Sequence, residues 1–167
     1  MKKRYIPIQI DTFSNSIFHK KENKEYQTTL LPVTPDDLSG ETEGWNFNWV
    51  KEASDYQVYK LVAIEKPNMI QGLISVEKQG GFYFVSLIEN APFNIGKDKE
   101  YSGVATNLFA FICKLSKENG FEGFVVFEAK TALIEHYKST LGAQTVGNSI
   151  RMFIDEAQAE KLIAIHF

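Results

Sequence analysis

The chain has 167 residues, of which 44% are hydrophobic and 13% aromatic, enough apolar side chain for one domain with a single large core. Its net charge of −3 and its pI near 5.7 argue against a general nucleic-acid binder, which usually carries a basic face. No segment approaches the apolar length of a membrane span, and the apolar run near the N-terminus is too short for a signal peptide. We therefore expect a cytoplasmic protein with neither nucleic acid nor membrane as partner.

Cysteine and histidine usage argues against two further classes of site. Cys113 is the single cysteine, which excludes a disulfide framework and a zinc–thiolate cluster and indicates a reducing compartment. The three histidines, His19, His136 and His166, show no metal-ligand spacing. We expect no metal.

The first third of the chain has weak patterns. Residues 13–55 are largely polar, with a plausible strand at residues 28–33 (TTLLPV) and a short helix around residues 45–53. Trp45, Phe47 and Trp49 are most simply core anchors, since large aromatic side chains are usually buried. The alternative interpretation is a wall of a substrate cleft.

From Tyr56 the patterns sharpen into three strands. Residues 56–65 are rich in β-branched and aromatic side chains, and KPN ends the run as a turn. Residues 69–77 (MIQGLISVE) and 82–89 (FYFVSLIE) flank the turn QGG, as a hairpin requires. These strands predict an antiparallel meander.

A helix and a buried strand follow. Apolar residues at positions 104, 108, 111, 112 and 115 have helical spacing, and Asn119-Gly120 suits a left-handed C-terminal cap. GFVVFE, residues 123–128, is an unbroken apolar run, which is typical of a strand buried on both faces and paired in parallel.

The last part predicts two more helices around one strand. Thr131 can cap a helix that Gly142 ends, residues 150–155 (IRMFID) form a strand, and Asp155 with Gln158 resembles a capping box for a helix through Ile165. The whole order predicts a single α+β domain, with one right-handed strand–helix–strand crossover after the meander.

Gly103 opens the first long helix in the stretch YSGVATNLFAF. A helix N-terminus presents free N–H groups and the positive end of the dipole, so it suits an anion such as phosphate. Glycine lets a ligand approach the backbone closely. A glycine before a helix is by itself more often only a turn, so both interpretations stay open at this point.

The order of elements, together with two motifs, resembles the GNAT superfamily of acyl-CoA N-acyltransferases over about residues 56–145. The family's Q/R-x-x-G-x-G/A signature aligns with residues 100–105 (EYSGVA), and its later helix-and-turn signature aligns with residues 134–143 (IEHYKSTLGA). The resemblance implies a mixed sheet with helices on both faces. Residues 1–55 are then a divergent N-terminal part, and residues 146–167 form a C-terminal strand and helix.

The resemblance also implies an acetyl-CoA site. A V-shaped opening would separate the third meander strand from GFVVFE, with the pantetheine arm bonded to backbone near Asn90 and Ala91. The pyrophosphate would rest on backbone N–H groups at the start of the helix, contributed by Ser102, Gly103, Val104, Ala105, Thr106 and Asn107.

Two positions depart from the family pattern. Glu100 stands where the family has Gln or Arg, and a carboxylate beside a pyrophosphate is repulsive. It must point away, be offset by Lys97 or Lys99, or weaken cofactor binding. Lys130 stands where many members carry Asn before the second helix, so that contact does not carry over.

Tyr137 and Glu89 are the candidate catalytic residues. The resemblance implies that Tyr137 protonates the departing CoA thiolate, a task that suits a phenol; the alternative is a core tyrosine. Glu89 ends the third meander strand and is a candidate base for an incoming ammonium; the alternative is a solvated strand end. His136 should face about 100° away from Tyr137 on the helix and lie at the surface.

These features predict an N-acyltransferase that moves an acetyl group from acetyl-CoA to a primary amine on a small molecule or peptide. The alternatives are a GNAT-like binding or regulatory module that holds CoA weakly or not at all, and a purely structural domain. Acceptor specificity would come from the N-terminal region and from the loops around residues 45–49 and 90–100. Monomer and homodimer both stay open.

Overall fold

The computed structural model describes residues 5–11 and 16–167. Its main element is a seven-stranded mixed sheet in the order β3-β4-β5-β6-β8-β10-β9. The strands are β3 (Thr28–Val33), β4 (Gln57–Ala63), β5 (Gly72–Gln79), β6 (Phe82–Asn90), β8 (Val125–Glu128), β10 (Arg151–Ile154) and β9 (Gln144–Thr145). A second, three-stranded sheet has the order β2-β1-β7. It is formed by β2 (Lys24–Tyr26), β1 (Ile17–His19) and β7 (Tyr101–Ser102).

The sequence-based order of elements is confirmed in the main sheet. Strands β4, β5 and β6 form an antiparallel meander, and β8 pairs with β6 in parallel across the connecting helix α3 (Val104–Glu118). Antiparallel β10 covers the other edge of β8. The apolar run of β8 is therefore explained by strands on both of its edges.

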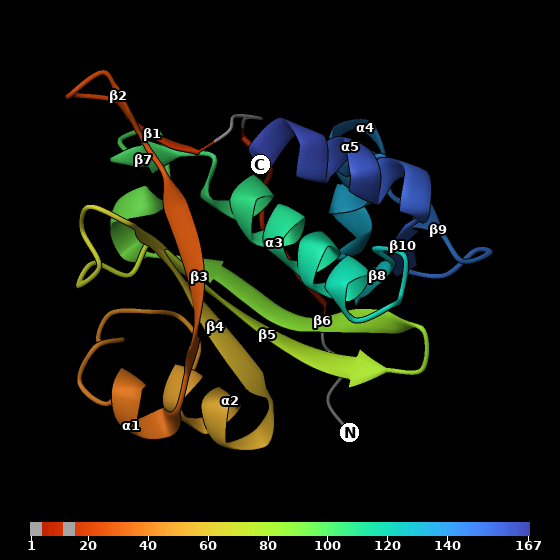
Figure 1. Cartoon of the computed structure of the whole chain (residues 1–167), viewed down its shortest axis with the longest axis horizontal. Coiled ribbons are helices and arrows are strands. Elements are labelled where there is room, and N and C mark those ends of the chain that lie inside the picture. Colours follow the sequence, from red (N-terminus) through yellow and green to blue (C-terminus); the bar gives the residue numbers. More distant parts are fainter. Residues whose placement is uncertain (1–4, 12–15) are drawn as a thin grey trace.

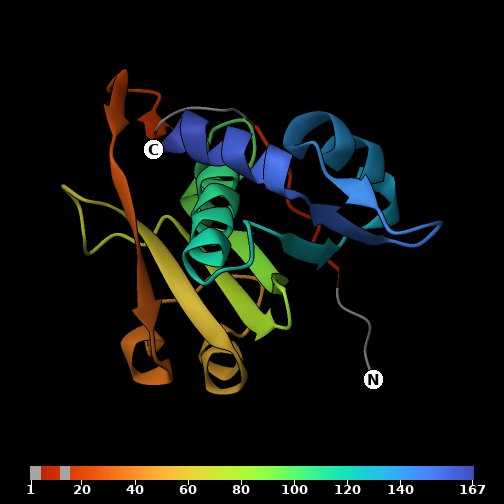
Figure 2. The same cartoon turned by 45° about the vertical axis from the view of Figure 1, so that its right-hand side comes forward.

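Helices lie on both faces of this sheet (Figure 1). On one face, α1 (Pro35–Leu38) and α2 (Trp49–Asp55) pack on a small core around Trp49. On the other face, α3 and α5 (Glu156–His166) cover the larger core, and Figure 2 shows α5 lying across α3. The predicted α+β architecture, a mixed sheet with helices on both faces, is confirmed.

Several element boundaries differ from the sequence-based expectation. Thr131 does not cap a helix: it begins a 3-10 turn, Thr131–Leu133, and Leu133 is the N-cap of α4 (Ile134–Leu141). The turn closes first because the Leu133 N–H bonds the Lys130 carbonyl at 2.8 Å, three residues back. Helix α2 begins only at Trp49 because Asn48 caps it, accepting from the Lys51 N–H at 3.1 Å.

The interpretation of the aromatic residues between positions 45 and 49 is confirmed in part. Trp49 is fully buried, and Trp45 and Phe47 pack against the same small core while staying partly exposed. Phe47 also lines a cavity. The core and the cleft-wall interpretations therefore both describe Phe47.

Gly72 sets how closely α3 approaches the sheet. A Cβ atom there would lie 2.9 Å from Val104 Cγ1, 3.0 Å from Leu108 Cδ1 and 3.2 Å from the Glu89 carbonyl oxygen. These distances are shorter than normal van der Waals contacts. The first turns of α3 therefore lie directly on the backbone of β5.

We predict that Gly72→Ala lowers the free energy of unfolding by about 1–3 kcal/mol, because the added methyl overpacks the contact between β5 and α3. Gly80→Ala is the matched control, since no atom lies within 4 Å of its Cβ position and its φ is not positive. Denaturant midpoints measure both. A Gly72→Ala variant as stable as the Gly80→Ala variant would contradict the predicted close approach.

Candidate functional site: a cleft between β6 and β8

A β-bulge separates the two central strands of the sheet. Val85 lies opposite Val76, but Leu87 lies opposite Ser75, so Ser86 is an extra residue in β6. Strand β8 pairs with β6 only along residues 83–85, which end where the bulge begins. Because a bulge bends its strand and interrupts pairing, the carboxyl-terminal half of β6 diverges from β8. The V-shaped opening expected from the resemblance is present.

A cavity of about 690 Å³ lies beside the diverging end of β6. Its walls come from four segments: residues 88–90 of β6, residues 46–47 before α2, the loop at residues 94–99, and residues 7–9 near the N-terminus. The loops that the sequence suggested for acceptor specificity thus contribute to its walls.

Glu89 lies at this cavity with a carboxylate that is already engaged. The residue is 5% exposed, and its two oxygens accept from the Asn46 N–H at 2.7 Å, the Phe47 N–H at 3.3 Å and the Trp49 indole N–H at 2.8 Å. Glu89 therefore holds the loop before α2 against β6. The alternative of a solvated strand end is wrong for this residue.

The two residues expected to meet the pantetheine arm differ in position: Asn90 lines the cavity, whereas Ala91 is fully buried and does not. The Ala91 N–H bonds the Gln71 carbonyl at 2.9 Å, so this group is satisfied within the protein. Asn90 lines the cavity, and its Oδ1 atom is buried with no hydrogen-bond partner among the described residues. A buried acceptor without a partner is uncommon and marks a place where a ligand N–H group fits.

Asn94 organises the loop that follows β6, and sequence reasoning missed it. Its Nδ2 group donates to Gln71 Oε1 at 2.9 Å and to the Gln71 carbonyl at 3.1 Å, and its Oδ1 atom accepts from the Tyr101 N–H at 3.0 Å. The residue is 2% exposed. It therefore ties the loop from residue 91 to residue 100 to Gln71, just before β5, and to β7.

The backbone at the start of α3 has the expected conformation, but its first N–H group is already bonded within the chain. Gly103 has a φ of 87°, the left-handed region that favours glycine. Its N–H does not face open space: it bonds Asp11 Oδ1 at 3.1 Å. Ser102 pairs with Phe18 in the small sheet.

The first turn of α3 is buried. Val104, Ala105, Thr106 and Asn107 are each at most 1% exposed. The Asn107 Oδ1 atom accepts from the Thr28 hydroxyl at 2.8 Å, and the Asn107 Nδ2 group lies 3.3 Å from His166 Nδ1. These contacts tie the turn to β3 and to the end of α5.

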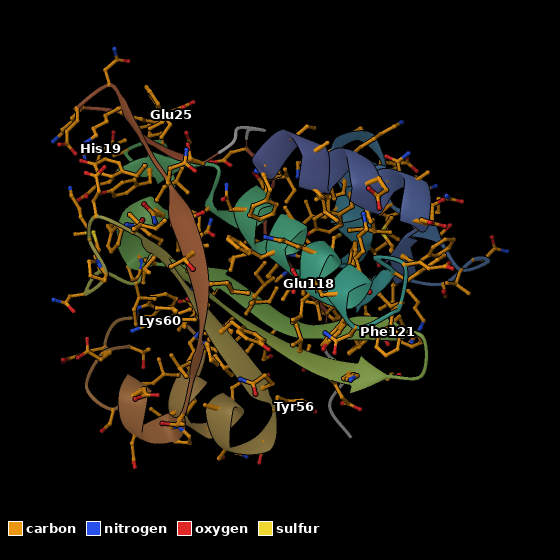
Figure 3. All side chains as sticks on the ribbon, in the orientation of Figure 1. His19, Glu25, Tyr56, Lys60, Glu118 and Phe121 are labelled. Atoms are coloured by element: carbon orange, nitrogen blue, oxygen red, sulfur yellow. The ribbon has the colours of Figure 1, made fainter. Side chains whose placement is uncertain are left out.

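Glu100 points away from the start of α3. Its side chain is 48% exposed and lies 4.0 Å from His19 Nε2, on the part of the structure where Figure 3 labels His19. The carboxylate at the helix N-terminus is instead that of Asp11, which also pairs with Lys99 Nζ at 2.9 Å. Of the three alternatives given for Glu100, the structure shows that its side chain points away from the start of α3.

Tyr137 lies beneath the N-terminal segment and does not line the cavity. The residue is fully buried, and its ring packs edge-on against Phe127 of β8 at 5.4 Å. The hydroxyl donates to the Ile8 carbonyl and, at 3.4 Å, to the Ile6 carbonyl. Burial raises the pKa of Tyr137, so the hydroxyl keeps its proton at neutral pH.

The sequence suggested that His136 lies at the surface, but the structure buries it in part. Its side chain is half-buried, and its Nε2 atom accepts from the Ile10 N–H at 2.8 Å. The N-terminal segment, distant in sequence, covers this side of α4.

The described residues contain no group of three or more His, Cys, Asp or Glu side chains arranged to hold a metal ion. Among the same residues, no helix has both the length and the apolar character to cross a membrane.

Comparison with solved structures identifies the fold. The complex AtaTR bound with acetyl-CoA matches with a TM-score of 0.52 and 11% identity, over 81% of this chain and 98% of that chain. The AtaT mutant toxin bound to the C-terminus of the antitoxin AtaR matches with a TM-score of 0.52 and 15% identity, over 81% and 96%. This chain therefore matches solved structures of GNAT acetyltransferases over most of its length. The chain has the GNAT fold.

The remaining comparisons give a weaker structural match and no sequence match. The ribosomal-protein-S18-alanine N-acetyltransferase from Escherichia coli matches over 77% of this chain and 90% of that chain, with 14% identity and a TM-score of 0.49. No family model matches the sequence. No curated protein matches it either.

We predict that Glu89→Gln lowers the free energy of unfolding by about 1–3 kcal/mol, because an amide offers one acceptor oxygen and turns an NH2 group toward the N–H donors. Glu118→Gln, at the exposed end of α3 (Figure 3), is the control and should be neutral. Thermal and denaturant unfolding measure both. Equal stability of the two variants would show that Glu89 does not hold the loop.

Proposed function

We propose that this chain is an acyl-CoA-dependent N-acyltransferase that moves an acyl group, most simply acetyl, to a primary amine. The observation that carries the proposal is the bulge at Ser86, which separates β6 from β8 beside a cavity of about 690 Å³. The GNAT fold supports the same activity. The resemblance in residues 100–105 and 134–143 supports it independently.

The residues of the cleft fit the cofactor. Asn90 offers a buried, unpartnered oxygen to an amide N–H such as those of a pantetheine arm, and β6 beyond Val85 has no strand on its cleft side among the described residues. The Gly103 N–H, with the residues after it at the start of α3, would hold the pyrophosphate. Acetyl-CoA, when bound, supplies the acyl group as a reactive thioester.

The chain's own residues have complementary tasks in this transfer. The amine nitrogen bonds to the acyl carbon, the carbon–sulfur bond breaks, and the bonding electrons leave with the sulfur. Tyr137 gives its hydroxyl proton to that sulfur, and the proton lost by the amine restores the hydroxyl, so the step is balanced. Positioning of the reactants supplies much of the rate.

Glu89 has two tasks in the proposal. It fixes the loop at residues 46–47, which forms one wall of the cavity, and it places a negative charge beside the entering ammonium. The base role then runs through a water on the cavity side of the carboxylate. The acceptor is a small-molecule or peptide amine that reaches the cavity from the side of this loop.

We predict that Tyr137→Phe lowers kcat by about 100-fold, as expected for loss of a general acid, without weakening acetyl-CoA binding. Tyr56→Phe, at the end of α2 (Figure 3), is the control. A thiol-release assay over an amine panel measures turnover, and calorimetry measures binding. A kcat that stays unchanged across the pH range would remove Tyr137 from the mechanism.

We predict that Asn90→Ala weakens acetyl-CoA binding by roughly fivefold, the value of one ordinary hydrogen bond. The melting temperature of the ligand-free variant should not fall, because the deleted oxygen has no partner among the described residues. Asn68→Ala, on an exposed turn, is the control. Weakened binding accompanied by an equal loss of stability would point to a structural role instead.

One observation favours the second candidate, a binding or regulatory module that holds CoA weakly or not at all. The Asp11 carboxylate already occupies the Gly103 N–H, and a carboxylate repels a pyrophosphate. Titration with acetyl-CoA separates the two functions. No heat and no thermal shift at millimolar ligand would favour the module over the enzyme.

A further inference from the structure

The segment from Tyr5 to Asp11 runs along the cleft and makes one isolated β-bridge, at Ile6. Its side chains alternate between buried and more exposed positions, with Ile6 at 0% and Ile10 at 6% exposure. It pairs in parallel with the chain just after β8, where the Ile6 N–H bonds the Glu128 carbonyl at 2.8 Å and the Lys130 N–H bonds the Ile6 carbonyl at 3.2 Å. It therefore uses the edge that the divergence of β6 and β8 leaves open.

The same segment engages groups that the proposed reaction needs. The Ile8 carbonyl accepts from the Tyr137 hydroxyl. Residues 7–9 line the cavity, whereas Tyr137 does not. The segment therefore lies between the proposed acid and the cavity in which the acceptor would react.

The end of the segment occupies the proposed phosphate position. Asp11 Oδ1 accepts from the Gly103 N–H at 3.1 Å, and Asp11 Oδ2 pairs with Lys99 at 2.9 Å. A carboxylate at a helix N-terminus satisfies the same N–H group and the same dipole that a phosphate oxygen would. Asp11 thus stands where the pyrophosphate is expected.

We propose that the segment from Tyr5 to Asp11 is an internal competitor of acyl-CoA, and that the two occupy the cleft in turn. This inference rests on the proposed acyl-CoA site. With the segment in place, the Tyr137 hydroxyl and the Gly103 N–H are both engaged, and the chain is inactive. Displacement of the segment releases both groups and opens the path from Tyr137 to the cavity.

Displacement of the segment breaks few backbone pairings, but it exposes Ile6 and Ile10, which belong to the larger core. Among the described residues, the segment joins the main sheet through the single bridge between Ile6 and Ala129. No ladder between the main-sheet strands has to break when it leaves. The apparent affinity for acyl-CoA is then the intrinsic affinity reduced by the fraction of molecules in which the cleft is free.

The first test compares Asp11→Ala with the wild-type chain. We expect Asp11→Ala to bind acetyl-CoA about tenfold more tightly, because the competing carboxylate is gone and a larger fraction of clefts is free. The affinity for acetyl-pantetheine, which lacks the pyrophosphate, should rise less on the same substitution. Asp36→Ala, on exposed α1, changes the net charge equally and should bind like the wild-type chain. Equal affinities for all three proteins would overturn the proposal.

The second test needs no variant. Hydrogen exchange should show the Ile6 and Ile10 amides protected in the free chain by the Glu128 carbonyl and His136 Nε2. Saturating acetyl-CoA should remove this protection. If acetyl-CoA binds while both amides stay protected, the proposed function stands and the competitor is wrong. If neither the wild-type chain nor Asp11→Ala binds acetyl-CoA at millimolar concentration, the proposed function fails and this inference fails with it.

Discussion

The one-residue bulge at Ser86 is the constraint from which the site follows. Up to Val85 the sheet is continuous, so β8 is buried between β6 and β10 and anchors the larger core. Beyond Val85, β6 and β8 can no longer satisfy each other's backbone groups, and buried backbone groups need partners. The hydrogen bonds between Ile6 and the backbone at Glu128 and Lys130 meet part of this need.

Glu89 joins the cleft to the opposite face of the sheet. Its carboxylate accepts the indole N–H of Trp49, which belongs to the small core under α1 and α2. A charge-assisted hydrogen bond of this kind is stronger than a neutral one, so the position of α2 and the wall of the cavity are fixed together. A change in the packing of the small core would therefore shift the wall of the cavity at residues 46–47.

Most of the fold could be predicted from the sequence because its signals are local. Runs of β-branched and aromatic residues with turn residues between them predicted the meander, and the apolar spacing after Gly103 predicted α3. The site was less predictable. Ile6, Ile8 and Ile10 alternate with polar or exposed residues, as a strand requires, but the amide of Ile10 bonds a side chain 126 positions away. Asp11 and Gly103 are 92 positions apart, and no local pattern names such a partner.

The N-terminus of α3 shows why a sequence motif alone does not determine which group binds there. The Gly103 N–H requires an acceptor, and both a phosphate oxygen of a ligand and a carboxylate of the chain meet this requirement. A carboxylate tethered to the same chain has an effective concentration in the millimolar range or above. A free ligand must therefore gain its advantage from contacts that Asp11 cannot make. The unpartnered oxygen of Asn90 and the open edge of β6 are two such contacts.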